Sequence, residues 1–145
     1  MIIETYSREE TKNLGKKLAA ESKAGDIFCL VGDLGVGKTV FSKGFSEGLK
    51  IDEIITSPTF SILNVYDKYE IPFYHFDVYR INHINEMEDT GYEDYFYGDG
   101  VCLIEWADIV REIIPQNAVW ITIEKDYNGD NENYRKIKIT ENKNI

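Results

Sequence analysis

Residues 32–39 form a glycine-rich octapeptide, GDLGVGKT, between two apolar segments. Gly32, Gly37, Lys38 and Thr39 fit the spacing G-x-x-x-x-G-K-[ST] of a phosphate-binding P-loop. Such a loop needs glycines because its backbone N–H groups point inward around phosphate oxygens, where a Cβ would obstruct the approach. The pattern places Lys38 beside the β and γ phosphates and the Thr39 hydroxyl where it can bind Mg²⁺. It therefore demands a strand before the loop and a helix after it.

The flanking segments have the character that a P-loop requires. Residues 26–31, DIFCLV, are a short apolar run that predicts a strand buried on both faces. Residues 40–49 carry apolar and small side chains at spacings of three and four, which predicts an amphipathic helix whose N-terminus faces the phosphates. The alternative is a glycine-rich turn that happens to carry a lysine, and the order strand, loop, helix argues against it.

Length and composition indicate one globular domain over residues 1–145, since 145 residues with 43% hydrophobic content suit a single core. No apolar run approaches the roughly 20 residues of a membrane span. The N-terminus, MIIETYSREE, lacks the basic start and apolar segment of a secretion signal. We therefore expect a cytoplasmic protein that does not contact a membrane. Cys29 and Cys102 fall in apolar runs without a second cysteine at ligand spacing, so we expect core residues.

The remaining segments predict a mixture of βαβ units and hairpins. A capping box formed by Ser7 and Glu10 predicts a helix to about residue 23. Strands are expected at 1–5, 59–67, 72–80, 101–106, 118–124 and 134–140, with a helical turn or loop at 91–97 and a short helix within 108–115. Their patterns predict that residues 59–67 and 72–80 form an antiparallel ribbon and that residues 134–140 form an edge strand. Together they predict a three-layer α/β P-loop NTPase domain with a mixed central sheet and antiparallel hairpins.

An acidic group at the carboxyl end of a neighbouring strand would complete a hydrolytic site. In residues 101–106, VCLIEW, four apolar residues precede Glu105, so this strand resembles a Walker B segment that holds Mg²⁺ directly or through water. The alternative is an ordinary solvated glutamate at a strand end. Trp106, which follows, fits a core or rim position as well as a surface that a partner recognises.

Asp77 is the second acidic candidate. Period-two alternation in the strand 72–80 puts His75 and Asp77 on the same face as neighbours. A carboxylate in so aromatic a strand is costly to bury unless a cation or hydrogen-bond donor meets it, and Mg²⁺, an attacking water, Arg80 or His75 would each serve. The alternative is a structural hydrogen-bonding role for Asp77 at the sheet edge.

Five segments in this order, GDLGVGKT, TSPTFSILNVY, YHFDVYR, GYEDYF and IEWAD, span almost the whole chain. Together they resemble the TsaE (YjeE) family. The resemblance implies an ATPase of the bacterial machinery that makes threonylcarbamoyladenosine next to the anticodon of tRNAs reading codons that begin with A. It also implies two protein partners, the transferase subunit TsaD and its companion TsaB.

The resemblance assigns roles to residues in this chain. It implies that ATP is bound by Asp33, Leu34, Gly35, Val36, Gly37, Lys38, Thr39 and Val40, that Thr39 and Glu105 hold Mg²⁺, and that Asp77 and Lys38 act on the reaction. Thr59 in the switch-like segment 57–60 would face the nucleotide, although a proline-containing turn explains that segment equally well. Thr11, with Ser7, would lie on the adenine side, and Arg135 would lie near the nucleotide.

Two other classes of protein also use a P-loop. A small-molecule kinase needs lid arginines that close over the transferred phosphoryl group, and between residues 67 and 124 the chain has only Arg80 and Arg111. A nucleotide-gated interaction module would bind ATP with little or no hydrolysis, and the sequence does not separate it from an ATPase that needs partners.

The net charge of −10 argues against direct binding of tRNA by the isolated chain. We expect its contribution to come through protein contacts, with the aromatic-rich region 66–97 and Trp106 as the interface, because tyrosine and tryptophan favour surfaces that become buried. The alternative is that these aromatic residues fill the core. ATP is expected to favour association by ordering residues 57–60.

Overall fold

The computed structural model of the chain describes all residues except 34, 57–61, 127, 130 and 142–145. In the described part, seven strands form one mixed sheet in the order β1-β7-β6-β2-β5-β4-β3. The strands are β1 (Ile2–Thr5), β2 (Ile27–Val31), β3 (Leu63–Tyr66), β4 (Phe73–Asp77), β5 (Val101–Glu105), β6 (Val119–Lys125) and β7 (Arg135–Glu141). β6, β2, β5 and β4 are parallel, whereas β3 pairs antiparallel with β4, and β7 pairs antiparallel with both β6 and β1.

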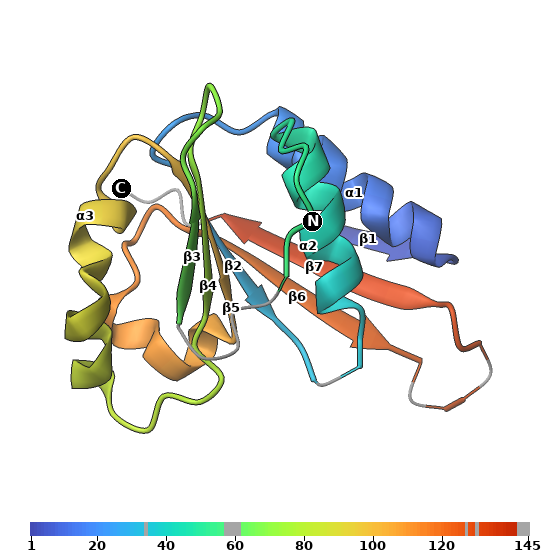
Figure 1. Cartoon of the computed structure of the whole chain (residues 1–145). Coiled ribbons are helices and arrows are strands. Elements are labelled where there is room, and N and C mark those ends of the chain that lie inside the picture. Colours follow the sequence, from blue (N-terminus) through green and yellow to red (C-terminus); the bar gives the residue numbers. More distant parts are fainter. Residues whose placement is uncertain (34, 57–61, 127, 130, 142–145) are drawn as a thin grey trace.

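Helices cover both faces of the sheet, which gives three layers (Figure 1). On one face lie α1 (Arg8–Ala20) and α2 (Lys38–Gly48). On the other lie α3 (Tyr92–Phe96) and the 3₁₀ helices η1 (Ile84–Thr90) and η2 (Ala107–Ile113). The predicted α/β class, mixed sheet and hairpins are therefore confirmed. No helix among the described residues is long and apolar enough to cross a bilayer.

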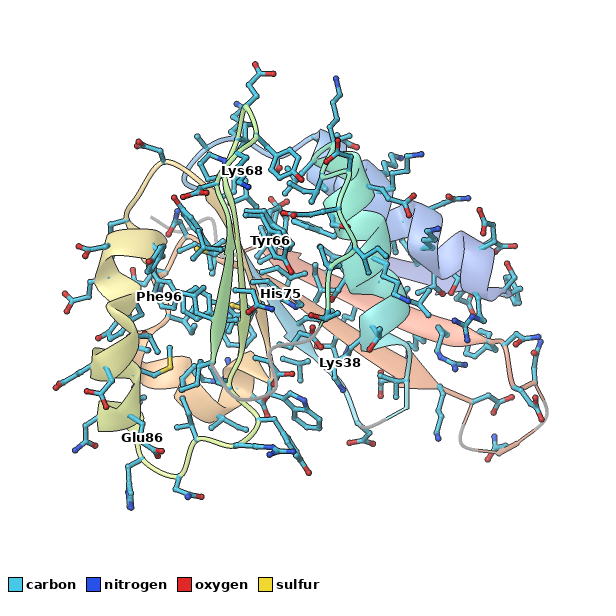
Figure 2. All side chains as sticks on the ribbon, in the orientation of Figure 1. Lys38, Tyr66, Lys68, His75, Glu86 and Phe96 are labelled. Carbon is cyan, nitrogen blue, oxygen red and sulfur yellow. The ribbon has the colours of Figure 1, made fainter. Side chains whose placement is uncertain are left out.

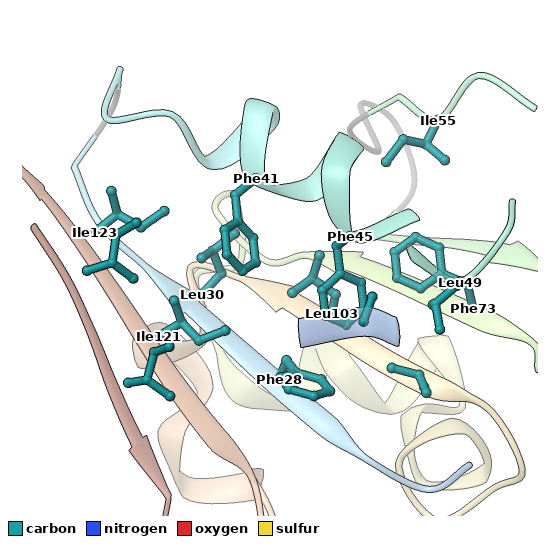
Figure 3. Packing of buried hydrophobic residues seen from close by; sticks show 14 of the residues in the cluster. Phe28, Leu30, Phe41, Phe45, Leu49, Ile55, Phe73, Leu103, Ile121 and Ile123 are labelled. Carbon is teal, nitrogen blue, oxygen red and sulfur yellow. The ribbon is translucent and has the colours of Figure 1, made fainter. Parts of the chain in front are cut away.

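Aromatic and aliphatic side chains of α2 fill the space above the sheet on its first face. Figure 3 shows Phe41 and Phe45 of α2 pointing toward Phe28 and Leu30 of β2 and Leu103 of β5. α1 lies directly against α2, since a Cβ at Gly44 would overlap the carbonyl oxygen of Lys12. The backbones of the two helices therefore approach each other closely, and this contact leaves no room for a side chain at Gly44.

The second face carries a separate apolar cluster. Phe76 of β4 meets Phe96 of α3 edge to face, with ring centroids 5.3 Å apart, and Met87 of η1 is buried beside them. Cys29 and Cys102 are free and fully buried in this cluster, as predicted.

Two expectations about the elements are wrong, and one element was not expected. β7 is not an edge strand, because β1 pairs along its outer side from Ile2 to Thr5. The first helix ends at Ala20 rather than near residue 23, with Glu21 as its C-cap. Residues 84–90 form a 3₁₀ helix that period-based reasoning missed, because it is short and its side chains are mostly polar.

Candidate functional site

The carboxyl ends of three parallel strands meet at one edge of the sheet. β5 lies between β2 and β4, so that Glu105 is in register with Leu30 on one side and Asp77 on the other. The P-loop leaves β2 after Val31 at the same edge. The predicted phosphate-binding loop and both predicted acidic residues are therefore brought together.

The P-loop leads straight into α2, as its pattern requires. Gly37 has φ of +105° at the N-cap of α2, a conformation that side-chain-bearing residues rarely adopt. Its carbonyl accepts the N–H of Phe41, which starts the helical hydrogen bonding. The N-terminus of the helix, with its unsatisfied N–H groups, thus lies at the loop where an anion would bind.

Lys38 lies inside the loop rather than in solvent. It is 7% exposed, and its Nζ donates to the carbonyl oxygens of Gly32 and Asp33, the latter at 2.8 Å. The ammonium group also lies 4.1 Å from the centroid of the Trp106 ring. Burial lowers the pKa of Lys38, and the carboxylate of Glu105 opposes that shift most strongly. The lysine is thus held by two backbone carbonyl groups of the loop itself and by the ring of Trp106, which lies outside the motif.

Glu105 is almost fully buried, with 3% of its surface exposed. Its Oε2 lies 2.6 Å from Nε2 of His75 and accepts a hydrogen bond from Oγ of Ser42 at 3.2 Å. The alternative of a solvated glutamate is therefore excluded. Of the groups considered as partners of Asp77, His75 makes its hydrogen bond to Glu105, across the two strands.

Asp77 is half-buried at the end of β4. Its Oδ1 accepts the backbone N–H of Tyr79 at 3.1 Å. Burial raises the pKa of Asp77, while the hydrogen bond from Tyr79 lowers it. The carboxylate of Glu105 raises it further, because two like charges so close are unfavourable.

A cleft of about 380 Å³ opens over these groups. It is lined by Arg8, Gly35, Gly37, Lys38, Thr39, Val40, Lys43, Asp77, Glu105 and Trp106. The oxygens of Thr39, Asp77 and Glu105 are the hard ligands that Mg²⁺ prefers. The described residues contain no group of three or more His, Cys, Asp or Glu side chains placed to hold a metal. Beside nucleotides, Mg²⁺ is generally held by one or two protein carboxylates together with phosphate oxygens and water.

A second pocket of about 190 Å³ continues from the P-loop toward α1 and β7, and its lining includes Arg8, Thr11, Val36, Val40 and Arg135. Arg135 donates through Nε to the carbonyl oxygen of Val36 at 2.6 Å, which ties β7 to the loop. The hydroxyl of Thr11 meets that of Thr5 at 2.7 Å.

The structure thus places Thr11, Val40 and Arg135 beside the P-loop. Their role in binding a nucleotide remains a prediction. Leu34 and Thr59 lie outside the described residues.

Sequence reasoning missed several groups at the site. Arg8 and Lys43 line the cleft, so that with Lys38 and Arg135 four cations surround the P-loop of an acidic chain. Ser42 lies three residues after Thr39 on α2, and this helical spacing could have predicted its direction toward β5. Nothing in the sequence around Arg8 or Lys43 marks either residue as part of a site.

The aromatic residues expected to form an interface divide into two sets. Phe73, Phe76 and Phe96 are buried and belong to the core. Tyr79 is 47% exposed and its ring lies 4.7 Å from that of Trp106, at the rim of the cleft. Tyr97, which is 71% exposed, lies on the α3 side. For the phenylalanines, the alternative of core packing is therefore correct.

Comparisons with known proteins agree on one family. The family model for threonylcarbamoyl adenosine biosynthesis protein TsaE matches residues 5–137. The tRNA threonylcarbamoyladenosine biosynthesis protein TsaE of Bacillus subtilis is 48% identical over 136 residues, covering 94% of this chain and 82% of that protein. The protein of the same name from Treponema pallidum is 38% identical over 126 residues, covering 87% of this chain and 93% of that protein. The crystal structure of Bacillus subtilis YdiB matches with a TM-score of 0.82 and 42% identity, covering 98% of this chain and 85% of that one.

Proposed function

Because this chain belongs to the TsaE family of threonylcarbamoyl adenosine biosynthesis proteins, we propose that it binds and hydrolyses ATP with Mg²⁺ in the biosynthesis of threonylcarbamoyladenosine in tRNA. The observation that carries the proposal is the meeting of the P-loop, Asp77 and Glu105 at the carboxyl ends of β2, β4 and β5. Ligands of α/β proteins bind at this edge of the sheet. We place the activity in the cytoplasm, where tRNA is modified in bacteria.

The P-loop supplies the phosphate site. Its backbone N–H groups and the N-terminus of α2 would donate to phosphate oxygens. Lys38, which donates to the carbonyls of Gly32 and Asp33, would exchange these acceptors for oxygens of the β and γ phosphates. Arg8, Lys43 and Arg135 add positive charge at the mouth of the cleft and so favour a polyphosphate.

The two acidic residues have different surroundings, which supports different roles. Glu105 is buried and held by two donors, so it suits a fixed Mg²⁺ ligand together with the Thr39 hydroxyl. When bound, Mg²⁺ would neutralise charge on the phosphate oxygens. Asp77 is half-buried with a raised pKa, which makes it the better acceptor for a hydrogen bond from an attacking water.

Exchanging each acid separately tests this division. Asp77→Asn is expected to spare nucleotide binding and to lower Mg²⁺-dependent turnover by about 100-fold, in the range of lost acid–base groups. Glu105→Ala is expected to weaken binding of Mg²⁺-ATP, with little effect on binding when Mg²⁺ is chelated. Calorimetry and a phosphate-release assay measure both. Identical defects in the two variants, or none, would contradict the division of roles.

We further propose that the chain works with TsaD and TsaB rather than on tRNA directly. The rim formed by Tyr79 and Trp106 is exposed enough to contact a partner and lies beside the nucleotide cleft, so a bound nucleotide would alter this surface. ATP is therefore expected to strengthen association.

Sedimentation with purified TsaD and TsaB, with and without an ATP analogue, tests the partnership, and a tRNA gel shift tests the isolated chain. ATP turnover is measured in the same mixtures. We expect association that depends on the nucleotide, turnover that rises with the partners, and negligible tRNA binding. Tight, salt-sensitive tRNA binding by the chain alone, or no association under any condition, would overturn the account. Nucleotide binding without turnover in any mixture would favour the interaction module.

A further inference from the structure

We propose that His75 is a positioning residue that fixes the orientation of the Glu105 carboxylate toward Mg²⁺. The inference rests on the proposed function, because it concerns how the metal ligand is held. Neither the P-loop pattern nor the Walker B pattern contains a histidine, and His75 lies on a different strand from both.

The contact between the two side chains is short and fully enclosed. Nε2 of His75 lies 2.6 Å from Oε2 of Glu105, and the two residues are 1% and 3% exposed. A carboxylate oxygen can only accept a hydrogen bond, so Nε2 of His75 donates it. Hydrogen bonds to an ionised acceptor are short and about twice as strong as neutral ones, so this bond holds the carboxylate firmly.

The imidazole ring is itself enclosed by its neighbours, although its Nδ1 has no hydrogen-bond partner among the described residues. His75 occupies the middle of β4, where it is in register with Asn64 of β3 and Leu103 of β5. Its ring stacks on that of Phe73, with centroids 5.6 Å apart and planes 14° apart. In Figure 2 the labelled His75 lies on the α2 side of β4, in the direction of Lys38. Packing of the ring against Phe73 thus restricts the direction from which Nε2 meets Glu105.

Ser42 supplies a second donor to the same oxygen. Its Oγ, from the first turns of α2, donates to Oε2 of Glu105 at 3.2 Å. Donors from β4 and α2 therefore approach Oε2 from two elements, which restricts rotation of the carboxylate about its last bond. Glu105 nonetheless lines the cleft with Thr39, so the carboxyl group reaches the place where Mg²⁺ is expected.

This arrangement repeats a general property of metal sites, in which outer partners orient the ligands and their loss costs about 10- to 100-fold in metal affinity. A purely structural role predicts something different, because a buried pair that only joins two strands would change stability and leave the metal untouched. Metal affinity, measured separately from stability, therefore distinguishes the two roles.

The experiment compares His75→Gln with His75→Asn. The side-chain amide of Gln reaches the position of Nε2 and can still donate to Glu105, whereas the shorter Asn cannot. Mn²⁺ binding in the presence of an ATP analogue is followed by electron paramagnetic resonance, and nucleotide binding in chelator by calorimetry. Thermal unfolding of each variant reports stability. His83→Gln, at an exposed histidine preceding η1, is the matched control.

We expect His75→Asn to lose about 10- to 100-fold in Mn²⁺ affinity with unchanged nucleotide binding in chelator, and His75→Gln to stay within a few-fold of the parent. Ser42→Ala, which removes the other hydrogen-bond donor to Glu105, is expected to lose less Mn²⁺ affinity than His75→Asn. If His75→Asn does not fold, the Gln and Ser42→Ala variants still decide: parental metal affinity in Ser42→Ala together with a large loss in His75→Gln would overturn the proposal. Equal Mn²⁺ affinities of His75→Asn and His75→Gln would also overturn the proposal. A parent that binds no nucleotide or Mn²⁺ would instead reject the proposed function.

Discussion

Two buried regions of this chain differ in the polarity of their side chains: one consists of polar and charged residues, the other of apolar residues. The polar end, defined as Lys38, Ser42, His75 and Glu105, lies where the parallel strands meet the P-loop, and each of its members is at most 7% exposed. The aromatic layer, defined as Phe76, Met87 and Phe96, lies on the other face of the sheet, where η1 and α3 pack against β4, and it is equally buried. Both regions are densely enclosed, yet only the second uses apolar side chains alone.

β4 shows how close the two regions are. His75 faces α2 and joins the polar end, whereas the next residue, Phe76, points to the opposite face and joins the aromatic layer. Burying polar groups is costly unless they are hydrogen-bonded. His75 and Ser42 each hydrogen-bond Glu105, whereas Nδ1 of His75 is buried without a hydrogen-bond partner among the described residues. Lys38 and Glu105 of the polar end line the cleft on which the proposed function rests, whereas the aromatic layer is apolar packing.

The largest expected effect belongs to the aromatic layer. Phe96→Ala removes a ring that is 2% exposed, and we expect it to lower the free energy of unfolding by about 3–5 kcal/mol. Nucleotide affinity of the folded fraction should not change. Tyr97→Ala, at the next residue, is the control, because a side chain that is 71% exposed should contribute within about 0.5 kcal/mol. Chemical denaturation measures both. Weakened nucleotide binding in folded Phe96→Ala would show that the two regions are coupled.

The next effect belongs to the polar end. Lys38→Ala is expected to weaken ATP binding by about 100-fold, or about 2.7 kcal/mol, because a charged donor to phosphate is lost. Some stability should also be lost, since Nζ donates to the carbonyl oxygens of Gly32 and Asp33. Lys43→Ala, which removes an exposed cation from the same cleft, is expected to reduce affinity only slightly. Calorimetry measures both variants, and parental affinity in Lys38→Ala would reject the P-loop interpretation.

Local patterns predicted most of the fold and the acidic residues of the site. The P-loop spacing and the apolar runs identified β2, α2 and β5 because each element has a strong period or motif of its own. The ribbon formed by β3 and β4 followed from its aromatic and β-branched residues.

Features that depend on pairing between distant segments were not predicted. β7 lies inside the sheet because the N-terminal strand β1 pairs with it, and alternation within β7 cannot reveal this. The hydrogen bond between His75 and Glu105 was likewise not predicted. Alternation places His75 beside Asp77 along β4, but the neighbour across the sheet, Glu105, comes closer to its ring nitrogen. Such contacts are decided by strand order, which the local sequence does not contain.

The smallest expected effect lies at the edge of the aromatic layer. The carboxylate of Glu86 in η1 accepts the backbone N–H groups of Asn82 and His83, each at 2.8 Å, and these bonds lower the pKa of Glu86 below its usual value of 4.5. A lowered folded-state pKa stabilises the fold above pH 4.5, and this contribution disappears as the pH falls through the folded value. Thermal unfolding should therefore show that Glu86→Gln is slightly less stable than the parent at pH 7, and that this difference vanishes in acid. Glu88→Gln, at another exposed glutamate of η1, controls for the change in net charge. An equal loss of stability in both variants, or a loss that persists in acid, would mean that the two hydrogen bonds of Glu86 make no specific contribution to stability. The aromatic layer would then owe its stability to apolar packing alone.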